Sequence, residues 1–329
     1  FFLLFNGIGL LFGIGSGILI SSEDGMGNKK KANQYFATGF VSILSIAIIL
    51  GLIWNYYLQP LCVILGANSD TIDLVLEYGK CIMAFAPVFM MSNYFAPIVR
   101  NMKNPKLVMC AVLTGSVLNV ILDYVFVFPM DMGMFGAAAA TVIGSLTTLL
   151  VLSTHFIKKQ NRVKINKETI SLNLLAPIFK CGFSSLIMEV ASGFVIFIFN
   201  IQILKYIGNN GIVVYGIISN CVLVGLALFN GVAQAAQPII ATNFGAGLNT
   251  RVKKVLKYAL ITTTIIGVSL FAVVFLFTGQ IIKVFVQANS EILSVGIPAL
   301  RLYLSAFCIM NINILISSYF QSVGKEKVA

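Results

Sequence analysis

Nine stretches of this chain are long enough and apolar enough to cross a lipid bilayer, and no other feature restricts its fold as strongly. A helix needs about 20 mostly apolar residues to cross a hydrocarbon core roughly 30 Å thick. Of the 329 residues, 58% are hydrophobic and 10% are charged, a composition typical of a membrane protein. The stretches lie at residues 1–20, 35–58, 76–99, 106–128, 134–156, 179–204, 212–240, 255–278 and 293–320.

These stretches are predicted to be helices. They lack the strict alternation of apolar and polar residues that marks the strands of a membrane barrel. Within lipid, only a helix satisfies all the backbone groups of a single segment internally. The sequence therefore predicts an all-α, polytopic membrane protein.

The basic residues orient the chain, because they gather in alternate loops. The net charge of +11 might suggest a nucleic-acid partner, but this distribution is the positive-inside pattern of a protein in a cytoplasmic membrane and needs no nucleic acid. His155 stands beside one basic loop and is predicted to be solvated or to contact lipid headgroups. The predicted inner loops hold 18 of the 22 basic residues: Lys29, Lys30, Lys31, Arg100, Lys103, Lys106, Lys158, Lys159, Arg162, Lys164, Lys167, Lys180, Arg251, Lys253, Lys254, Lys257, Lys325 and Lys327.

The chain contains an internal repeat. Gly25 and Gly27 of "SSEDGMGNKK" superpose on Gly245 and Gly247 of "ATNFGAGLNT" at a shift of 220, and "RNMKNPKL" superposes on "QSVGKEKV" at 221. Six stretches separate equivalent points, so the two copies run in the same direction across the membrane. We therefore expect an N-terminal lobe at residues 1–160, a basic linker at 161–178 and a C-terminal lobe at 179–329. We also expect twelve helices in the complete protein, with the first and the last two outside this chain.

Five segments resemble, in order and spacing, those of the multidrug and toxic compound extrusion (MATE) transporters, especially the bacterial multidrug members. They are "GIGSGILISSEDGMGNKKKANQ", "VRNMKNPKLVM", "LNVILDYVFVFPMDMGMFGAAAATVIG", "QPIIATNFGAG" and "YFQSVGKEK". The resemblance implies two six-helix lobes and export of organic cations against Na+ or H+. Glu23 and Asp24 depart from the family pattern, which usually has neutral or apolar residues there.

Two acidic residues, Asp123 and Glu189, lie within the predicted spans. A carboxylate in the membrane is expensive and marks an ion or proton pathway by default. Asn119 lies one helical turn before Asp123 on the same face, so the pair offers oxygen ligands to Na+ or a carboxyl group that takes up a proton. The resemblance implies a cation site built from Asn119, Asp123 and Thr141. Asp123 has two simpler explanations: a bond between helices, or contact with external water.

Other polar and flexible residues are candidates for a cavity. Glu189, about 15 Å along its helix, resembles a family acid that serves cation coupling or substrate charge in the second lobe. Asn230, Gln234 and Gln237 share a helix and predict either a wet cavity or hydrogen bonds between helices. Met90 and Tyr94 are candidates for an adaptable apolar lining, with core packing as the alternative.

The sequence thus predicts a secondary multidrug antiporter rather than an enzyme. We expect no cofactor, a coupling ion that is Na+ or H+, small amphipathic cations as substrates, the lipid bilayer as surroundings and a monomeric state. A related architecture, the lipid-linked oligosaccharide flippase, is the alternative, but it would require more basic residues inside the spans. A channel would need a ring of polar residues along a pore, which is not apparent.

Overall fold

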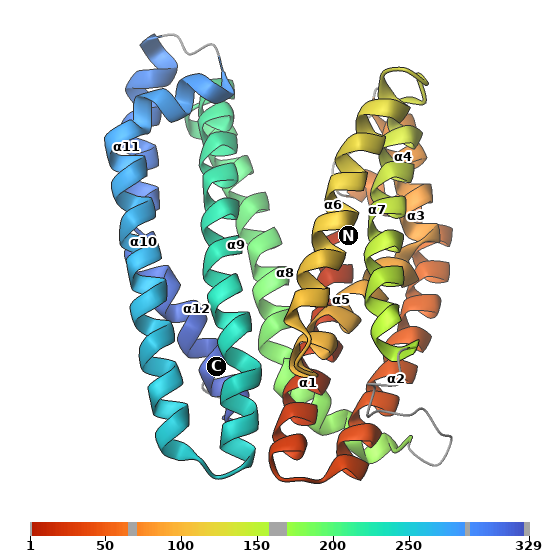
Figure 1. Cartoon of the computed structure of the whole chain (residues 1–329). Helices are drawn as coiled ribbons and strands as arrows, with labels where there is room; N and C mark the ends of the chain where they lie inside the picture. The colour runs from red at the N-terminus through yellow and green to blue at the C-terminus, as the bar shows by residue number, and fades with distance from the viewer. Residues whose placement is uncertain (1, 65–70, 158–169, 287–289, 326–329) are drawn as a thin grey trace. The chain divides into compact units, whose positions relative to one another are not determined.

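The computed structural model describes residues 2–64, 71–157, 170–286 and 290–325, and this part of the chain is helical with no strand (Figure 1). The predicted all-α class is confirmed. The helices are α1 (Phe2–Gly25), α2 (Lys29–Tyr56), α3 (Leu58–Ile64), α4 (Ile72–Ala84), α5 (Ala86–Asn101), α6 (Pro105–Val127), α7 (Gly133–Ile157), α8 (Leu175–Tyr206), α9 (Asn209–Gly245), α10 (Asn249–Phe285), α11 (Ser290–Leu304) and α12 (Phe307–Ser322).

Within the described residues, eight helical segments are long and apolar enough to cross a membrane, and counting the bent pair α4 and α5 as one span gives nine. The stretch predicted at 76–99 forms a bent span, because α4 and α5 meet at a bend of 54°. The bend follows Phe85, and Pro87 stands in the first turn of α5. Proline has no backbone N–H, so it suits the start of a new helix and cannot continue α4. The stretch predicted at 293–320 is likewise divided, into α11 and α12.

The chain divides into two compact units, Phe1–Glu189 and Val190–Ala329. In the first unit, α1 packs on α2 and α5, while α6 and α7 form a hairpin whose α7 packs on α4 and α5. In the second unit, α9 packs on α10, α11 and α12 around the rings of Phe229 and Phe307. Residues 161–169, half of the predicted linker at 161–178, lie outside the described residues, and the predicted lobe boundaries stay a prediction.

The outer faces of the helices are apolar. On α6, for example, Val120 is 67% exposed and Tyr124 is 64% exposed. A water-soluble protein seldom exposes apolar surface continuously along a helix, whereas lipid solvates such a face without cost. This pattern agrees with the membrane prediction.

The internal repeat is confirmed at two pairs of turns. Between α1 and α2, Gly27 N donates to Asp24 O and Asn28 N to Glu23 O; between α9 and α10, Gly247 N donates to Phe244 O and Leu248 N to Asn243 O. Each of the four residue numbers in the first turn is 220 lower than that of its counterpart in the second turn. Gly27 and Gly247 have φ values of 78° and 74°, a left-handed conformation that favours glycine. The turn after α5 and the turn after α12 match in the same way, with Asn104 N to Val99 O and Lys325 N to Phe320 O.

Glu23 and Asp24 leave this turn geometry intact, because each forms an ion pair. Glu23 is bound by Lys31 at 2.8 Å, and Asp24 is bound by Lys103, in the turn after α5, also at 2.8 Å. The two acids therefore tie the end of α1 to the neighbouring basic turns. Their departure from the family pattern has a local structural explanation.

Candidate functional site

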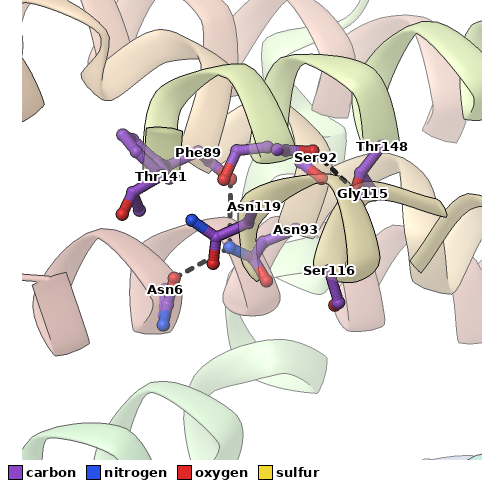
Figure 2. A pocket seen from close by; sticks show the side chains of 11 residues that line it. Asn6, Phe89, Ser92, Asn93, Gly115, Ser116, Asn119, Thr141 and Thr148 are labelled. Carbon is purple, nitrogen blue, oxygen red and sulfur yellow. Dashed lines mark hydrogen bonds between the residues drawn. The ribbon is translucent and has the colours of Figure 1, made fainter. Parts of the chain in front are cut away.

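The first unit contains a polar cavity of about 320 Å³. Four helices line it, α1, α5, α6 and α7, and its side chains are mostly hydroxyls and amides without a formal charge (Figure 2). Such a polar surface inside a bundle of apolar helices is costly unless it meets water or a ligand. The lining residues are Asn6, Phe89, Ser92, Asn93, Gly115, Ser116, Asn119, Thr141, Gly144, Ser145 and Thr148.

The α6–α7 wall of the cavity depends on two glycines. A Cβ atom added to Gly144 would lie 2.8 Å from the Cβ of Asn119, and one added to Gly115 would lie 2.6 Å from the carbonyl oxygen of Gly144. Thr148 donates to the carbonyl oxygens of Ala111 at 3.3 Å and of Gly144 at 3.1 Å. The two helices therefore touch through their backbones beside Asn119, which fixes the position of this side chain.

Asn119 and Asp123 are hydrogen-bonded to each other. The Nδ2 atom of Asn119 donates to the Oδ2 atom of Asp123 at 3.0 Å, as their spacing of one helical turn allows. Asn119 lines the cavity, whereas Asp123 is half-buried and lies one turn beyond the lining residues. Because the amide nitrogen is turned to Asp123, the Asn119 Oδ1 atom remains an acceptor.

Thr141 lines the same cavity from α7, so Asn119 and Thr141 face one cavity, while their role in binding a cation stays a prediction. Its hydroxyl donates to the carbonyl oxygen of Ala137 at 2.9 Å, which leaves its oxygen lone pairs available. Asp123, Asn119 and Thr141 therefore each offer an oxygen atom, the ligand type of a hard cation. Within the described residues, no group of three His, Cys, Asp or Glu side chains is placed to bind a transition metal.

The cavity residues that the sequence analysis missed include two asparagines, Asn6 and Asn93. Asn93 of α5 donates through Nδ2 to the Oδ1 atom of Asn6 on α1 at 2.9 Å and to the carbonyl oxygen of Phe89 at 3.0 Å (Figure 2). Asn6 interrupts the apolar run "FFLLFNGIG", so a search for any polar side chain in a lipid-length segment, wider than the search for acids that selected Asp123, would have found it.

Glu189 lies beside α1 and outside the lining of the cavity. It is half-buried and belongs to the first compact unit, as its last residue. A Cβ atom added to Gly7 would lie 3.2 Å from the Cβ of Glu189, which places this residue next to the helix that carries Asn6. Its role in coupling or in substrate charge stays a prediction.

The remaining candidates do not line this cavity. Met90 and Tyr94 are completely buried in the core of the first unit, and the Tyr94 hydroxyl donates to the carbonyl oxygen of Phe36 at 2.8 Å. On α9, Gln237 is 3% exposed, and its Oε1 atom has no hydrogen-bond partner in the described part of the chain. Asn230 and Gln234 are half-buried on the same helix.

Comparisons with known proteins agree with this geometry. The MatE family profile matches residues 1–125 and 184–329. The chain is 27% identical to a multidrug export protein MepA of Staphylococcus saprophyticus and 29% identical to one of Staphylococcus aureus, over 100% of this chain and 72% of each relative.

Solved structures share the fold. One is a MATE transporter in complex with MaL6, and another is the outward-facing conformation of a multidrug resistance MATE family transporter of the MOP superfamily. Each has a TM-score of 0.92 and 22% identity; the matches cover 99% of this chain and 74% and 73% of those chains. The chain belongs to the MatE family, the multidrug and toxic compound extrusion transporters.

Proposed function

We propose that this protein is a monomeric secondary transporter that exports small amphipathic cations in exchange for inward Na+ or H+, by alternating access. The family consists of transporters rather than enzymes, and the chain is a multi-pass protein of a bacterial cytoplasmic membrane. The finer assignment, to cation exchange at a particular site, rests on the residues described next.

The observation that carries the proposal is the hydrogen bond between Asn119 and Asp123 at the edge of an uncharged polar cavity. A carboxylate within a membrane helix costs free energy, so a protein that keeps one there is expected to use its charge. Among the described residues, no basic side chain forms an ion pair with Asp123. A transported cation or a proton is therefore the natural counter-charge.

Either coupling ion uses the same residues. Na+ would be held by the carboxylate of Asp123, the Oδ1 atom of Asn119 and the hydroxyl of Thr141. A proton would be taken up by the carboxylate itself, and the amide of Asn119 would orient the acid. In both cases, coupling requires that the ion bind one arrangement of the protein more tightly than the other.

The cavity also argues against the flippase alternative. Recognition of a pyrophosphate-linked lipid calls for Lys or Arg around the headgroup. The cavity in the first unit has none among its lining residues. Hydroxyls and amides suit an organic cation, which they solvate by hydrogen bonds and dipoles.

The test is dye efflux from vesicles that contain the purified protein, with an imposed Na+ gradient in one set and an imposed pH gradient in the other. The proposal predicts efflux of a cationic dye under at least one inward ion gradient, and no efflux without a gradient. Equal efflux with and without both gradients would contradict ion coupling. Vesicles without protein provide the baseline.

A further inference from the structure

His155, the only histidine of these 329 residues, is buried near the end of α7. The prediction that it is solvated or contacts lipid headgroups is wrong, because the residue is 8% exposed and its ring packs edge-on against Phe156, with 5.3 Å between centroids. Its Nδ1 atom lies 3.2 Å from the Nδ2 atom of Asn104. Its Nε2 atom is buried and has no hydrogen-bond partner in the part of the chain that the structure describes.

Asn104 is also the N-cap of α6. Its Oδ1 atom accepts a hydrogen bond from the backbone N–H of Leu107 at 3.3 Å, which fixes the orientation of the amide. The amide nitrogen therefore faces His155, and an amide nitrogen only donates. The Nδ1 atom of His155 must be the acceptor, so the ring is neutral and carries its proton on Nε2.

The packing contacts between α6 and α7 run from this pair of residues to the candidate cation site. Along α7, His155, Thr148 and Gly144 are separated by seven and four residues, so they share one face of the helix. Their partners on α6 are Asn104, then Ala111 and Gly115, and finally Asn119. Asn104 and Asn119 are thus two points on one helix, about 22 Å apart along its axis.

We propose that Asn104 and His155 form a proton-sensitive cap, in which a second proton on His155 releases the N-cap of the helix that carries Asn119 and Asp123. Protonated Nδ1 is a donor and would face the donor nitrogen of Asn104. If the Asn104 amide turns over, its oxygen accepts from His155, but its nitrogen then faces the N–H of Leu107. In either orientation, the amide oxygen of Asn104 accepts a hydrogen bond from the His155 ring or from the N–H of Leu107, but not from both.

Among the described groups around the N-cap of α6, His155 is the one whose protonation would account for the pH response. Among the described residues, the acids at this end of the first unit are Glu23 and Asp24, which are paired with Lys31 and Lys103, and none of the described acids forms an ion pair with His155. On α4, which also packs on α7, the charged residues Asp73, Glu77 and Lys80 lie toward the opposite end of the unit. The other titratable groups at this end on the described elements packed around His155 include basic and phenolic side chains: Lys29, Lys30 and Tyr35 on α2, Arg100 on α5 and Lys106 on α6.

The basic residues predict that this end faces the cytoplasm, so the cap would respond to cytoplasmic acidification. Loss of an N-cap changes a helix-end equilibrium by roughly 5- to 30-fold. An effect of this cap on transport rests on the proposed role of Asp123, which lies on the same helix. The pH response of the cap itself does not depend on that role.

The first test is nitrogen NMR of the purified protein labelled with 15N-histidine and carrying no histidine tag, because a single residue then gives the whole signal. At pH 8 we expect the neutral tautomer with the proton on Nε2. In the Asn104→Asp variant, the carboxylate still caps Leu107 and also accepts from the ring, so we expect the proton on Nδ1 or a charged ring at the same pH. A wild-type ring protonated on Nδ1 at pH 8 would overturn the proposal.

The second test is hydrogen exchange of the first turn of α6 at pH 8 and pH 5.5, corrected for intrinsic rates. The first turn of α2 is the internal control, because Asn28 caps it through Lys31 N at 3.3 Å in the same way. We expect protection to fall about 5- to 30-fold at pH 5.5 in α6 and not in α2.

Both His155→Phe and Asn104→Asp should abolish this pH response. An equal response in α6 and α2, or an unchanged response in Asn104→Asp, would contradict the proposal. Neither measurement involves transport. Failure here therefore leaves ion exchange at Asp123 standing, and failure of that exchange leaves the cap standing.

Discussion

The amide of Asn119 donates a hydrogen bond to the carboxylate of Asp123 across 3.0 Å, one turn along α6. This bond links a residue that lines a polar cavity to the acid that lies just beyond it. It also leaves the oxygen of Asn119 on the cavity side as an acceptor. The proposed ion exchange depends on this pair and on the close contact of α6 with α7 that holds it.

Replacement of Gly144 by alanine should disturb that contact. The added methyl group would lie 2.8 Å from both the Asn119 Cβ and the Gly115 carbonyl oxygen, so the helices must separate, at a cost of about 1–3 kcal/mol. Thermal unfolding in detergent measures the loss of stability. Gly231→Ala in α9 is the matched control, because an added Cβ meets nothing within 4 Å there. An equal effect of both substitutions would contradict the tight packing described here.

The Asn6–Asn93 bond should contribute a measurable coupling between α1 and α5. A double-mutant cycle of Asn6→Ala and Asn93→Ala, read by thermal unfolding, should give an interaction energy of about 0.6 kcal/mol, and at most about 1.7 kcal/mol. Asn220→Ala provides the control for Asn93→Ala, since Asn220 bonds only within its own helix, to Gly216 O, in the described contacts. Strict additivity of the two substitutions would show that the bond contributes nothing.

Substitution of Glu189 by glutamine should distinguish substrates by charge. If this acid attracts the charge of the substrate, the variant should transport a cationic dye several-fold more slowly and leave a neutral substrate of similar size nearly unaffected. The glutamine side chain keeps the shape and much of the polarity beside Gly7. Initial efflux rates for both substrates provide the measurement, and an equal reduction would remove the charge-recognition role.

Much of this architecture is predictable because the membrane restricts the possibilities. An apolar run long enough to cross the lipid bilayer usually forms a helix. The turn at Met26–Asn28 is repeated at Ala246–Leu248, and each turn needs a glycine with positive φ. The break between α4 and α5 was missed, although Pro87 marks it. Apolar character continues through such a bend and hides it from a count of hydrophobic residues.

The candidate site was predictable only in part. Asn119 and Asp123 are four residues apart on one helix, so their contact follows from helical geometry. The contact between Asn6 and Asn93 joins residues 87 positions apart, and that between Asn104 and His155 joins residues 51 apart. Neither contact can be predicted from the spacing of its two residues along the sequence. The burial of His155 likewise depends on the packing of α7 against other helices.

The most direct test of the account is ion-driven efflux by Asp123→Asn compared with Asp131→Asn in reconstituted vesicles. Asparagine at 123 still accepts a bond from Asn119, so insertion and folding should remain, but its charge and its exchangeable proton are lost. Asp131 is an exposed residue between α6 and α7 and serves as the matched control. The account predicts that Asp123→Asn falls to the rate of protein-free vesicles while Asp131→Asn keeps the wild-type rate; undiminished ion-driven efflux by Asp123→Asn would contradict it.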